Sequence, residues 1–489
     1  MAAGHDVVVI GVDSSTQATK ALAVNVQTGE VVGRGRAAHT VSGGAARESE
    51  PEQWWAALGE ALGQTGFADT AAAVSVGGQQ HGLVALNEAG RSVHPALLWN
   101  DVRSAPNAEA LVERLGAKEW AERVGSVPGA SFTAAKWDWL REHQPAAAER
   151  ARTVFLPHDY LTWRLTGERV TDRGDVSGTG WWGPEGYDSE ILGLIGLDEG
   201  YLPRVAEPGT SAGSVRADLP LREGALVATG TGDNMAAALG LGLEPGVPVI
   251  SLGTSGTAYA VTRGRPADPS GTVAGFADAL GNWLPLACTL NCTLAVDRVA
   301  AWFGLDREAV EPGGAAVVLP YLDGERTPNL PHASGLFYGL RHDTTPGQIL
   351  RAAYEGAAAS LLTAVDEVLA AGGETADRDK PLILIGGGAR GNAWLTTVRR
   401  LAGRPVLVPE AEEIVALGAA AQAAALVTGE RADEVARRWN TREGRLYDPL
   451  TADQGVLDRI AAVRGRAEAL LGDVDHAGAD ANAGDGDVG

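Results

Sequence analysis

Lysine is scarce in this sequence: only four of its 40 basic residues are lysine, and the other 36 are arginine. A Walker A phosphate loop ends in a lysine followed by serine or threonine. The lysines here are followed by alanine, glutamate, tryptophan and proline, at Lys20, Lys118, Lys136 and Lys380 respectively. The sequence therefore excludes a Walker A loop, and any nucleotide must be bound in another way.

Cysteine and long apolar runs are also rare. Two cysteines, Cys288 and Cys292, are too few for a disulfide framework and lack a second pair for zinc. No segment approaches the ~18 consecutive apolar residues of a membrane span. The first apolar run, residues 7–12, is too short for the hydrophobic region of a signal peptide. We therefore expect a cytoplasmic protein that does not bind membranes.

Positive charge is in deficit, because 40 basic residues stand against 62 acidic ones and give a formal net charge of −22. Nucleic acids and anionic lipids are bound through basic surfaces. The balance thus argues against both as partners. It also raises the question of how so acidic a protein could bind an anionic substrate.

The 489 residues carry a repeat of half the chain length. An apolar strand, a turn of small polar residues and a second apolar strand occur at residues 7–24 and again at 246–264. Strands elsewhere alternate with helical segments, which indicates an α/β protein. We predict two similar domains facing each other, at 1–243 and 244–471. The Gly-, Ala- and Asp-rich residues 472–489 are expected to form a disordered acidic tail.

The turns of the two repeats are candidates for binding phosphate. The first follows Asp13 and contains Thr16, whereas the second runs through Gly253, Thr254 and Ser255 without an acidic residue. Backbone N–H groups in such turns form anion-binding concavities. Mg²⁺ bound to phosphates is also held by a carboxylate, either directly or through the waters around the metal. Asp13 offers such a carboxylate. Each turn alone is weak evidence, but the pair at matching positions predicts a nucleotide gripped from both sides.

A glycine turn near the end of the sequence admits two interpretations. Gly386, Gly388 and Gly391 form the pattern G-x-G-x-x-G after an apolar strand, and Glu410 lies about twenty residues further on. This matches the fingerprint of NAD(P)-dependent dehydrogenases. The surrounding segments show no clear βαβαβ array, and a dehydrogenase gives the paired turns no role. The glycines serve equally well as a flat surface for adenine.

Asp233 is the candidate general base. It follows the strand at residues 225–228 and a glycine turn, and an alanine-rich helix begins there. The helix dipole favours an ionised carboxylate at this position, which is available to accept a proton. A plain helix cap is the alternative.

Polar side chains also follow two other apolar strands. They are able to hydrogen-bond to a polyol or stack on it, and they are Gln80, His81, Trp99, Asn100 and Asp101.

Several motifs together resemble the FGGY family of carbohydrate kinases, within the actin/hexokinase/Hsp70 superfamily. Residues 131–143, with Lys136 and Trp139, resemble the first family signature, and residues 335–356 resemble the second. Three further segments also match the family in order and spacing: residues 320–328, residues 156–168 and the alanine-rich segment around Gly418. The resemblance extends from about residue 6 to about residue 450.

The resemblance implies two actin-like (ribonuclease H-like) domains with ATP and a sugar bound in a cleft between them. The N-terminal FGGY domain carries the first phosphate hairpin and the sugar site; the C-terminal one carries the second loop and the adenine site. Asp233 matches the catalytic base and Asp13 the acid that works with Mg²⁺ and ATP. Sugar contacts are expected from Gln80, His81, Asn234 and Trp99, phosphate contacts from Thr16, Gly253, Thr254 and Ser255, and adenine contacts from Gly387, Gly388 and Asn392.

One position of the first turn and one residue pair depart from patterns found in the family. Ser15 occupies a place that is usually glycine in the first turn, where a Cβ narrows the approach of phosphate. Gln80 and His81 replace the Arg-Glu pair of glycerol kinases, which argues against glycerol as the substrate.

We expect phosphorylation of a ketopentose, with D-xylulose favoured and D-ribulose or L-ribulose open. A dehydrogenase and a non-catalytic ATP-binding protein are weaker alternatives. The expected partners are ATP and a small sugar. The sequence leaves open whether the protein forms a homodimer.

Overall fold

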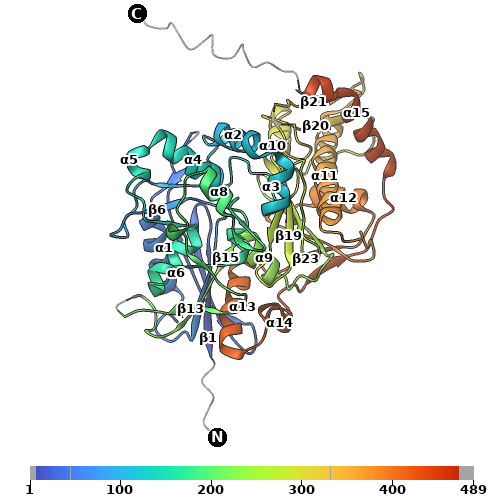
Figure 1. Cartoon of the computed structure of the whole chain (residues 1–489). Coiled ribbons are helices and arrows are strands. Elements are labelled where there is room, and N and C mark those ends of the chain that lie inside the picture. Colours follow the sequence, from blue (N-terminus) through green and yellow to red (C-terminus); the bar gives the residue numbers. More distant parts are fainter. Residues whose placement is uncertain (1–6, 45, 218, 331, 473–489) are drawn as a thin grey trace, which may run out of the picture.

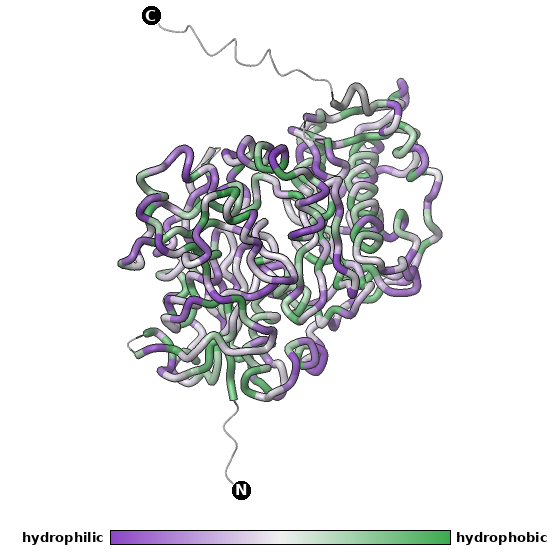
Figure 2. The backbone as a smooth tube through the Cα atoms, viewed as in Figure 1, coloured by the Kyte–Doolittle hydropathy of each residue, from purple (hydrophilic) through white to green (hydrophobic). Residues whose placement is uncertain are grey.

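The structure is a computed structural model that describes residues 7–44, 46–217, 219–330 and 332–472. The predicted tail beyond Gly472 lies outside these residues. Two halves lie side by side, each built around a seven-stranded mixed sheet with helices against it (Figure 1). Hydrophobic segments lie mainly in the interior strands and their neighbouring helices, and hydrophilic ones mainly in outer loops (Figure 2).

The first sheet has the strand order β13-β14-β5-β1-β2-β3, and β15 also pairs with β5. The hairpin β1–β2 is antiparallel, with Asp13 opposite Lys20, and β5 runs parallel to β1. The strands are β1 (Val8–Ser14), β2 (Ala18–Asn25), β3 (Val31–Ala38), β5 (Ala73–Gly78), β13 (Ser211–Ser214), β14 (Leu226–Ala228) and β15 (Thr231–Gly232).

The second sheet repeats this arrangement in the order β18-β19-β17-β16-β22-β23-β24. The hairpin β16–β17 is antiparallel, and β22 runs parallel to β16 as β5 does to β1. The duplication predicted from the sequence is therefore present in the topology. The strands are β16 (Pro248–Leu252), β17 (Gly256–Ala260), β18 (Ala274–Ala277), β19 (Trp283–Thr289), β22 (Leu382–Ile385), β23 (Val406–Pro409) and β24 (Gly444–Tyr447).

Short strand pairs and helices complete the architecture. The pairs are β4 (Glu48–Ser49) with β7 (Ala96–Leu97), β6 (Val84–Leu86) with β8 (Thr153–Phe155), β9 (Val170–Thr171) with β12 (Arg204–Val205), β10 (Trp182–Gly183) with β11 (Gly186–Tyr187), and β20 (Val317–Leu319) with β21 (Leu336–Tyr338). The helices are α1 (Pro51–Gln64), α2 (Ala105–Leu115), α3 (Ala117–Val124), α4 (Thr133–His143), α5 (Pro145–Ala148), α6 (Pro157–Thr166), α7 (Arg173–Val176), α8 (Ser189–Leu194), α9 (Asp233–Gly240), α10 (Thr293–Trp302), α11 (Pro346–Ala371), α12 (Asn392–Ala402), α13 (Ile414–Thr428), α14 (Ala432–Arg438) and α15 (Gln454–Gly472). In the described part of the chain, no helix has both the length and the apolar composition to cross a bilayer.

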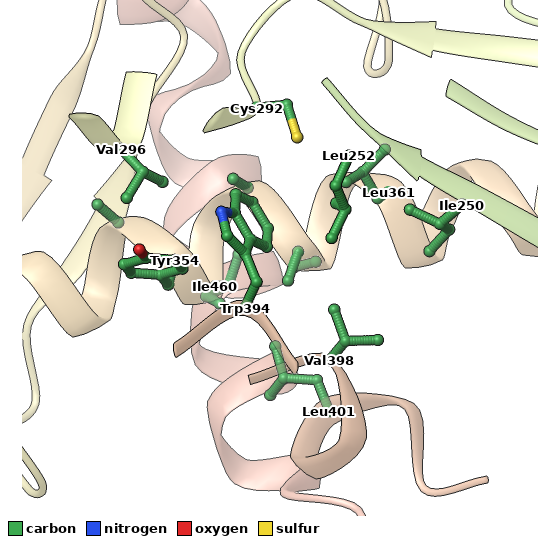
Figure 3. Packing of buried hydrophobic residues seen from close by; sticks show 14 of the residues in the cluster. Ile250, Leu252, Cys292, Val296, Tyr354, Leu361, Trp394, Val398, Leu401 and Ile460 are labelled. Atoms are coloured by element: carbon green, nitrogen blue, oxygen red, sulfur yellow. The ribbon is translucent and has the colours of Figure 1, made fainter. Parts of the chain in front are cut away.

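The largest apolar core surrounds α11 in the second half (Figure 3). This helix begins with a capping box, in which Thr345 and Gln348 each bond the other's backbone N–H and satisfy otherwise unpaired donors. Tyr354 of α11 meets Trp394 of α12 edge to face, with the ring centres 5.0 Å apart. Such aromatic packing fixes α12, and with it the glycine turn that precedes α12.

Helix α13 leaves the second half and packs on the first sheet. Its alanines share an apolar cluster with Val9 of β1 and Leu22 of β2. Figure 1 shows this helix in orange beside the blue strands of the N-terminal half. The proposed division at residue 243 stays a prediction, but the segment 244–471 does not pack as one separate body.

The hairpin β18–β19 also connects the halves. Arg173 of α7 donates to Asp278 Oδ1 (3.1 Å) and to the carbonyl of Asn282 (2.6 Å). The Ala277 N–H donates to Ser177 Oγ at 2.8 Å. Helix α7 and the second sheet are thereby held together next to the candidate site.

Candidate active site

Three strands of the first sheet end at one edge, and each presents a predicted site residue there. Asp13, the last but one residue of β1, lies opposite Gly77 of β5. The strand β15 pairs with the same end of β5 and leads directly into Asp233. The turn after β5 carries Gln80 and His81. Sequence-distant residues are thus brought together by the sheet register.

Asp13 is buried, and this burial raises the pKa of its carboxyl. The Ser15 hydroxyl donates to its Oδ1 at 2.7 Å, and Lys20 Nζ lies 3.6 Å from its Oδ2; both lower the pKa. Lys20 also donates to Glu413, just before α13 (2.7 Å). The Ser15 side chain therefore stabilises the ionised form of Asp13 by a hydrogen bond.

Asp233 is the first residue of α9, as predicted. Its Oδ1 accepts from the backbone N–H of Asn234 (2.8 Å). Burial, together with the charges of Asp13 and Asp175, raises the pKa of Asp233 to about 7. Burial, with a smaller effect of the Asp233 charge, also raises the pKa of Cys288 on β19. Helix α9, which Asp233 begins, packs against the second sheet, where Met235 shares an apolar cluster with Tyr259 of β17.

The four predicted sugar contacts divide into two groups. Asn234 Nδ2 donates to Gln80 Oε1 (2.5 Å) and to Asp233 Oδ1 (3.0 Å). Asn234 and Gln80 are thereby connected to the candidate base. His81 follows Gln80 directly. Trp99 donates through Nε1 to the hydroxyl of Thr16 (3.2 Å), so it lies against the first phosphate hairpin. The residues predicted to bind sugar and those predicted to bind phosphate are therefore adjacent in the first half.

The aromatic side chains around His81 were not predicted. Phe132 stacks on its ring with centres 5.9 Å apart, and Phe276 of β18 lies 4.8 Å away at a tilt. Phe276 comes from the second half of the chain, so no local pattern indicated it. Asp101, one of the polar residues considered for a polyol, is instead paired with Arg103 through both carboxylate oxygens.

The second turn and the glycine turn adjoin each other. The Thr293 N–H, at the start of α10, donates to the carbonyl of Gly253 (3.1 Å). A Cβ on Gly386 (φ 86°) would lie 2.8 Å from the Leu252 carbonyl oxygen, so glycine is required for this approach. Gly387 faces open space, and Asn392 opens α12.

The dehydrogenase interpretation of the glycine turn is wrong. In the described second sheet β22 is parallel to β16 and β23, but β16 and β23 each have an antiparallel partner on their other side. A dinucleotide-binding fold requires a run of parallel strands joined by crossovers. The glycines instead shape a surface beside the second phosphate turn.

Comparison with known proteins identifies the class. Residues 8–240 match the N-terminal domain, and residues 249–427 the C-terminal domain, of the FGGY family of carbohydrate kinases. The chain therefore belongs to this family. The enzyme class and the actin-like two-domain fold expected from the sequence are confirmed.

Individual relatives share most of the chain. The xylulose kinase of Streptomyces coelicolor is 66% identical over 477 residues, which cover 96% of this chain and 98% of the relative. The xylulose kinase of Streptomyces rubiginosus is 65% identical over the same shares. The crystal structure of a xylulose kinase from Bifidobacterium adolescentis is similar with a TM-score of 0.82 and 34% identity, covering 94% of this chain and all of that one.

Proposed function

We propose that this protein transfers the γ-phosphate of ATP to D-xylulose and forms D-xylulose 5-phosphate. The observation that carries the proposal is the site around Asp233: a carboxylate of raised pKa, joined to Gln80 and Asn234, beside a hairpin suited to phosphate. The identity of 66% to a xylulose kinase supports the choice of sugar. A cytoplasmic location and a homodimer stay predictions.

In this proposal Asp233 accepts the proton of the sugar hydroxyl while that oxygen attacks the γ-phosphate. Phosphoryl transfer depends mainly on positioning and charge stabilisation. Asn234 and Gln80 orient the sugar by hydrogen bonds, and His81 lies beside them. The backbone N–H groups of the turns at Thr16 and Thr254 hold the phosphates. Gly387, Gly388 and Asn392 receive the adenine.

Asp13 is the residue that fits a metal. Mg²⁺ in kinases is held by one or two carboxylates together with substrate phosphates and water. Among the described residues no group of three or more His, Cys, Asp or Glu side chains forms a metal cage, and a lone carboxylate beside a phosphate turn suits this mode. Bound Mg²⁺ would neutralise charge on the phosphates.

The proposed base predicts a pH dependence. Asp233 must be ionised to accept a proton, and its pKa of about 7 places the change within the assay range. We expect kcat/KM for the ketose to fall on the acid side of about pH 7 by about tenfold per pH unit. Steady-state assays across this range check it. A profile that stays level through neutral pH would contradict the assignment.

The substrate is tested by coupled ADP release with D-xylulose, D-ribulose, L-ribulose, xylitol and glycerol. We expect kcat/KM for D-xylulose to exceed the others by about tenfold or more, because each misplaced hydroxyl leaves polar groups of the site unpaired. Reactions without sugar give the ATP hydrolysis baseline. Equal or better activity on another compound would overturn the choice of D-xylulose while leaving the kinase assignment intact.

A further inference from the structure

A buried cluster of one histidine and three aspartates lies in the first half and has no role in the mechanism above. His158 and Asp159 open α6, and Asp172 and Asp175 lie at the start of α7. All four side chains are almost completely buried. His158 Nε2 lies 3.3, 3.4 and 3.5 Å from carboxylate oxygens of Asp159, Asp172 and Asp175 respectively.

The cluster lies directly beneath the strand ends that carry the site. A Cβ on Gly78, at the end of β5, would lie 2.9 Å from His158 Cβ. Asp172 Oδ2 accepts from the hydroxyl of Thr231, which precedes Asp233 by two residues, at 2.6 Å. The cluster therefore contacts the supports of both the sugar-binding turn and the candidate base.

Asp175 extends from the cluster to His81. Its Oδ1 accepts from the backbone N–H of His81 at 3.2 Å and lies 3.0 Å from His81 Nδ1. His81 has φ 60°, a left-handed conformation that residues other than glycine rarely adopt. Such a conformation persists only where neighbours enforce it. Here Thr133 also donates to the His81 carbonyl at 3.0 Å.

The other side of the imidazole indicates which nitrogen carries the proton. Gln80 Nε2, an amide donor, lies 3.4 Å from His81 Nε2. The amide orientation is fixed, because Gln80 Oε1 accepts from Asn234 Nδ2. A donor facing Nε2 and a carboxylate facing Nδ1 both favour the proton on Nδ1. Nε2 is then an acceptor, and the amide of Gln80 faces it.

We propose that Asp175 is a positioning residue that fixes His81 with its proton on Nδ1, so that Nε2 accepts from the Gln80 amide and keeps Gln80 oriented toward the sugar. The inference rests on the proposed function for the identity of the sugar. The second carboxylate oxygen of Asp175, Oδ2, lies 3.5 Å from His158 Nε2. Burial alone would lower the pKa of His158, but the three carboxylates raise it to about 9, so His158 supplies positive charge at neutral pH.

A double-mutant cycle with Asp175→Asn and His81→Ala tests the coupling. Asparagine keeps the size of the side chain but removes its charge. We expect Asp175→Asn to reduce kcat/KM for D-xylulose by about 10–100-fold, chiefly through KM, with KM for ATP unchanged. In assays well above the Asp233 pKa of about 7, where that base stays ionised, the same substitution in the His81→Ala background should change kcat/KM by less than about twofold, since its target is gone. A loss of equal size in both backgrounds, or no loss in either, would overturn the proposal.

A matched control is Asp188→Asn. Asp188 is the N-terminal cap of α8, where it accepts from the backbone N–H groups of Glu190 and Ile191 and pairs with Arg123, and it lies outside the site. The Asp188→Asn substitution should leave kcat/KM within about twofold of the wild-type value, because asparagine caps helices as well as aspartate does. Absence of D-xylulose-dependent ADP release in the wild-type enzyme would refute the proposed function instead.

A second measurement needs no folded Asp175 variant. Imidazole ¹⁵N NMR of the wild-type enzyme at alkaline pH, with the His81 signals identified by their loss in His81→Ala, reports the tautomer. A proton on Nδ1 supports the proposal. A proton on Nε2 overturns it, whatever the substrate proves to be.

Discussion

Replacing Asp233 with asparagine should lower kcat for D-xylulose phosphorylation by about 10²–10⁴-fold, the usual contribution of a general base. Asparagine has nearly the same shape and retains an oxygen that accepts from the Asn234 backbone N–H. It has no basic oxygen to take the hydroxyl proton. Sugar binding, measured by calorimetry, should stay within about threefold, because no contact to Gln80 or His81 is removed.

The same substitution should not destabilise the fold. A folded-state pKa raised from 3.8 to about 7 means that the ionised carboxylate is less stable in the folded protein than in the unfolded chain. The resulting cost is present above pH 7 and disappears as the pH falls below the unfolded pKa. Neutral asparagine removes that cost, so at alkaline pH the melting temperature should be unchanged or higher.

Asp233 is identified as the general base only if Asp233→Asn loses activity and its melting temperature is not lowered. The Asp188→Asn variant serves as the control for the substitution itself, since it changes an aspartate at another helix start. Loss of activity together with a lowered melting temperature would indicate a structural role for Asp233. Full turnover in Asp233→Asn would show that another group accepts the proton.

Features with a local cause could be predicted from the sequence. The two hairpins follow from apolar strands on either side of small polar turns, and the structure contains both. The helix start at Asp233 follows from a glycine turn before an alanine-rich segment. Their roles in binding came from the family resemblance, since a turn shows no ligand by itself.

Features created by tertiary packing could not be predicted in this way. Phe276 reaches His81 from the other half of the chain, and no spacing rule links the two positions. Asp175 is similarly remote, lying 94 residues beyond the His81 N–H it accepts. The motif at residues 156–168 indicated the family, but nothing local revealed that His158 would be buried among carboxylates.

The packing of α13 on the first sheet could not be predicted for a different reason. A helix usually shows its partner through one apolar face. Nearly every side chain from Ile414 to Ala425 is buried, so α13 is apolar on all sides and has no distinguishing face. It lies between β1 and α9 and contacts both through backbone atoms. This contact is the basis of the remaining prediction.

Three glycines permit the close approach. A Cβ on Gly11 of β1 would lie 1.9 Å from the Ala416 carbonyl oxygen, and one on Gly240 of α9 would lie 2.1 Å from that of Ile414. A Cβ on Gly418 of α13 would lie 1.8 Å from the carbonyl oxygen of Ala236. Each obstructing atom belongs to the backbone, so no side-chain rotation relieves the clash. The helix and its neighbours would have to separate.

Gly418→Ala should therefore lower the free energy of unfolding by about 3 kcal/mol, the upper part of the range for overpacked cores. Alanine favours helix over glycine by about 1 kcal/mol, so the measured loss is net of that gain. For a domain of this size it corresponds to a melting temperature lower by about 6–12 °C. Gly63→Ala is the matched control, because Gly63 lies in α1 with no atom near its Cβ position, and it should be neutral or stabilising. Equal melting temperatures for Gly418→Ala and the wild type would show that α13 does not pack on the first sheet as described.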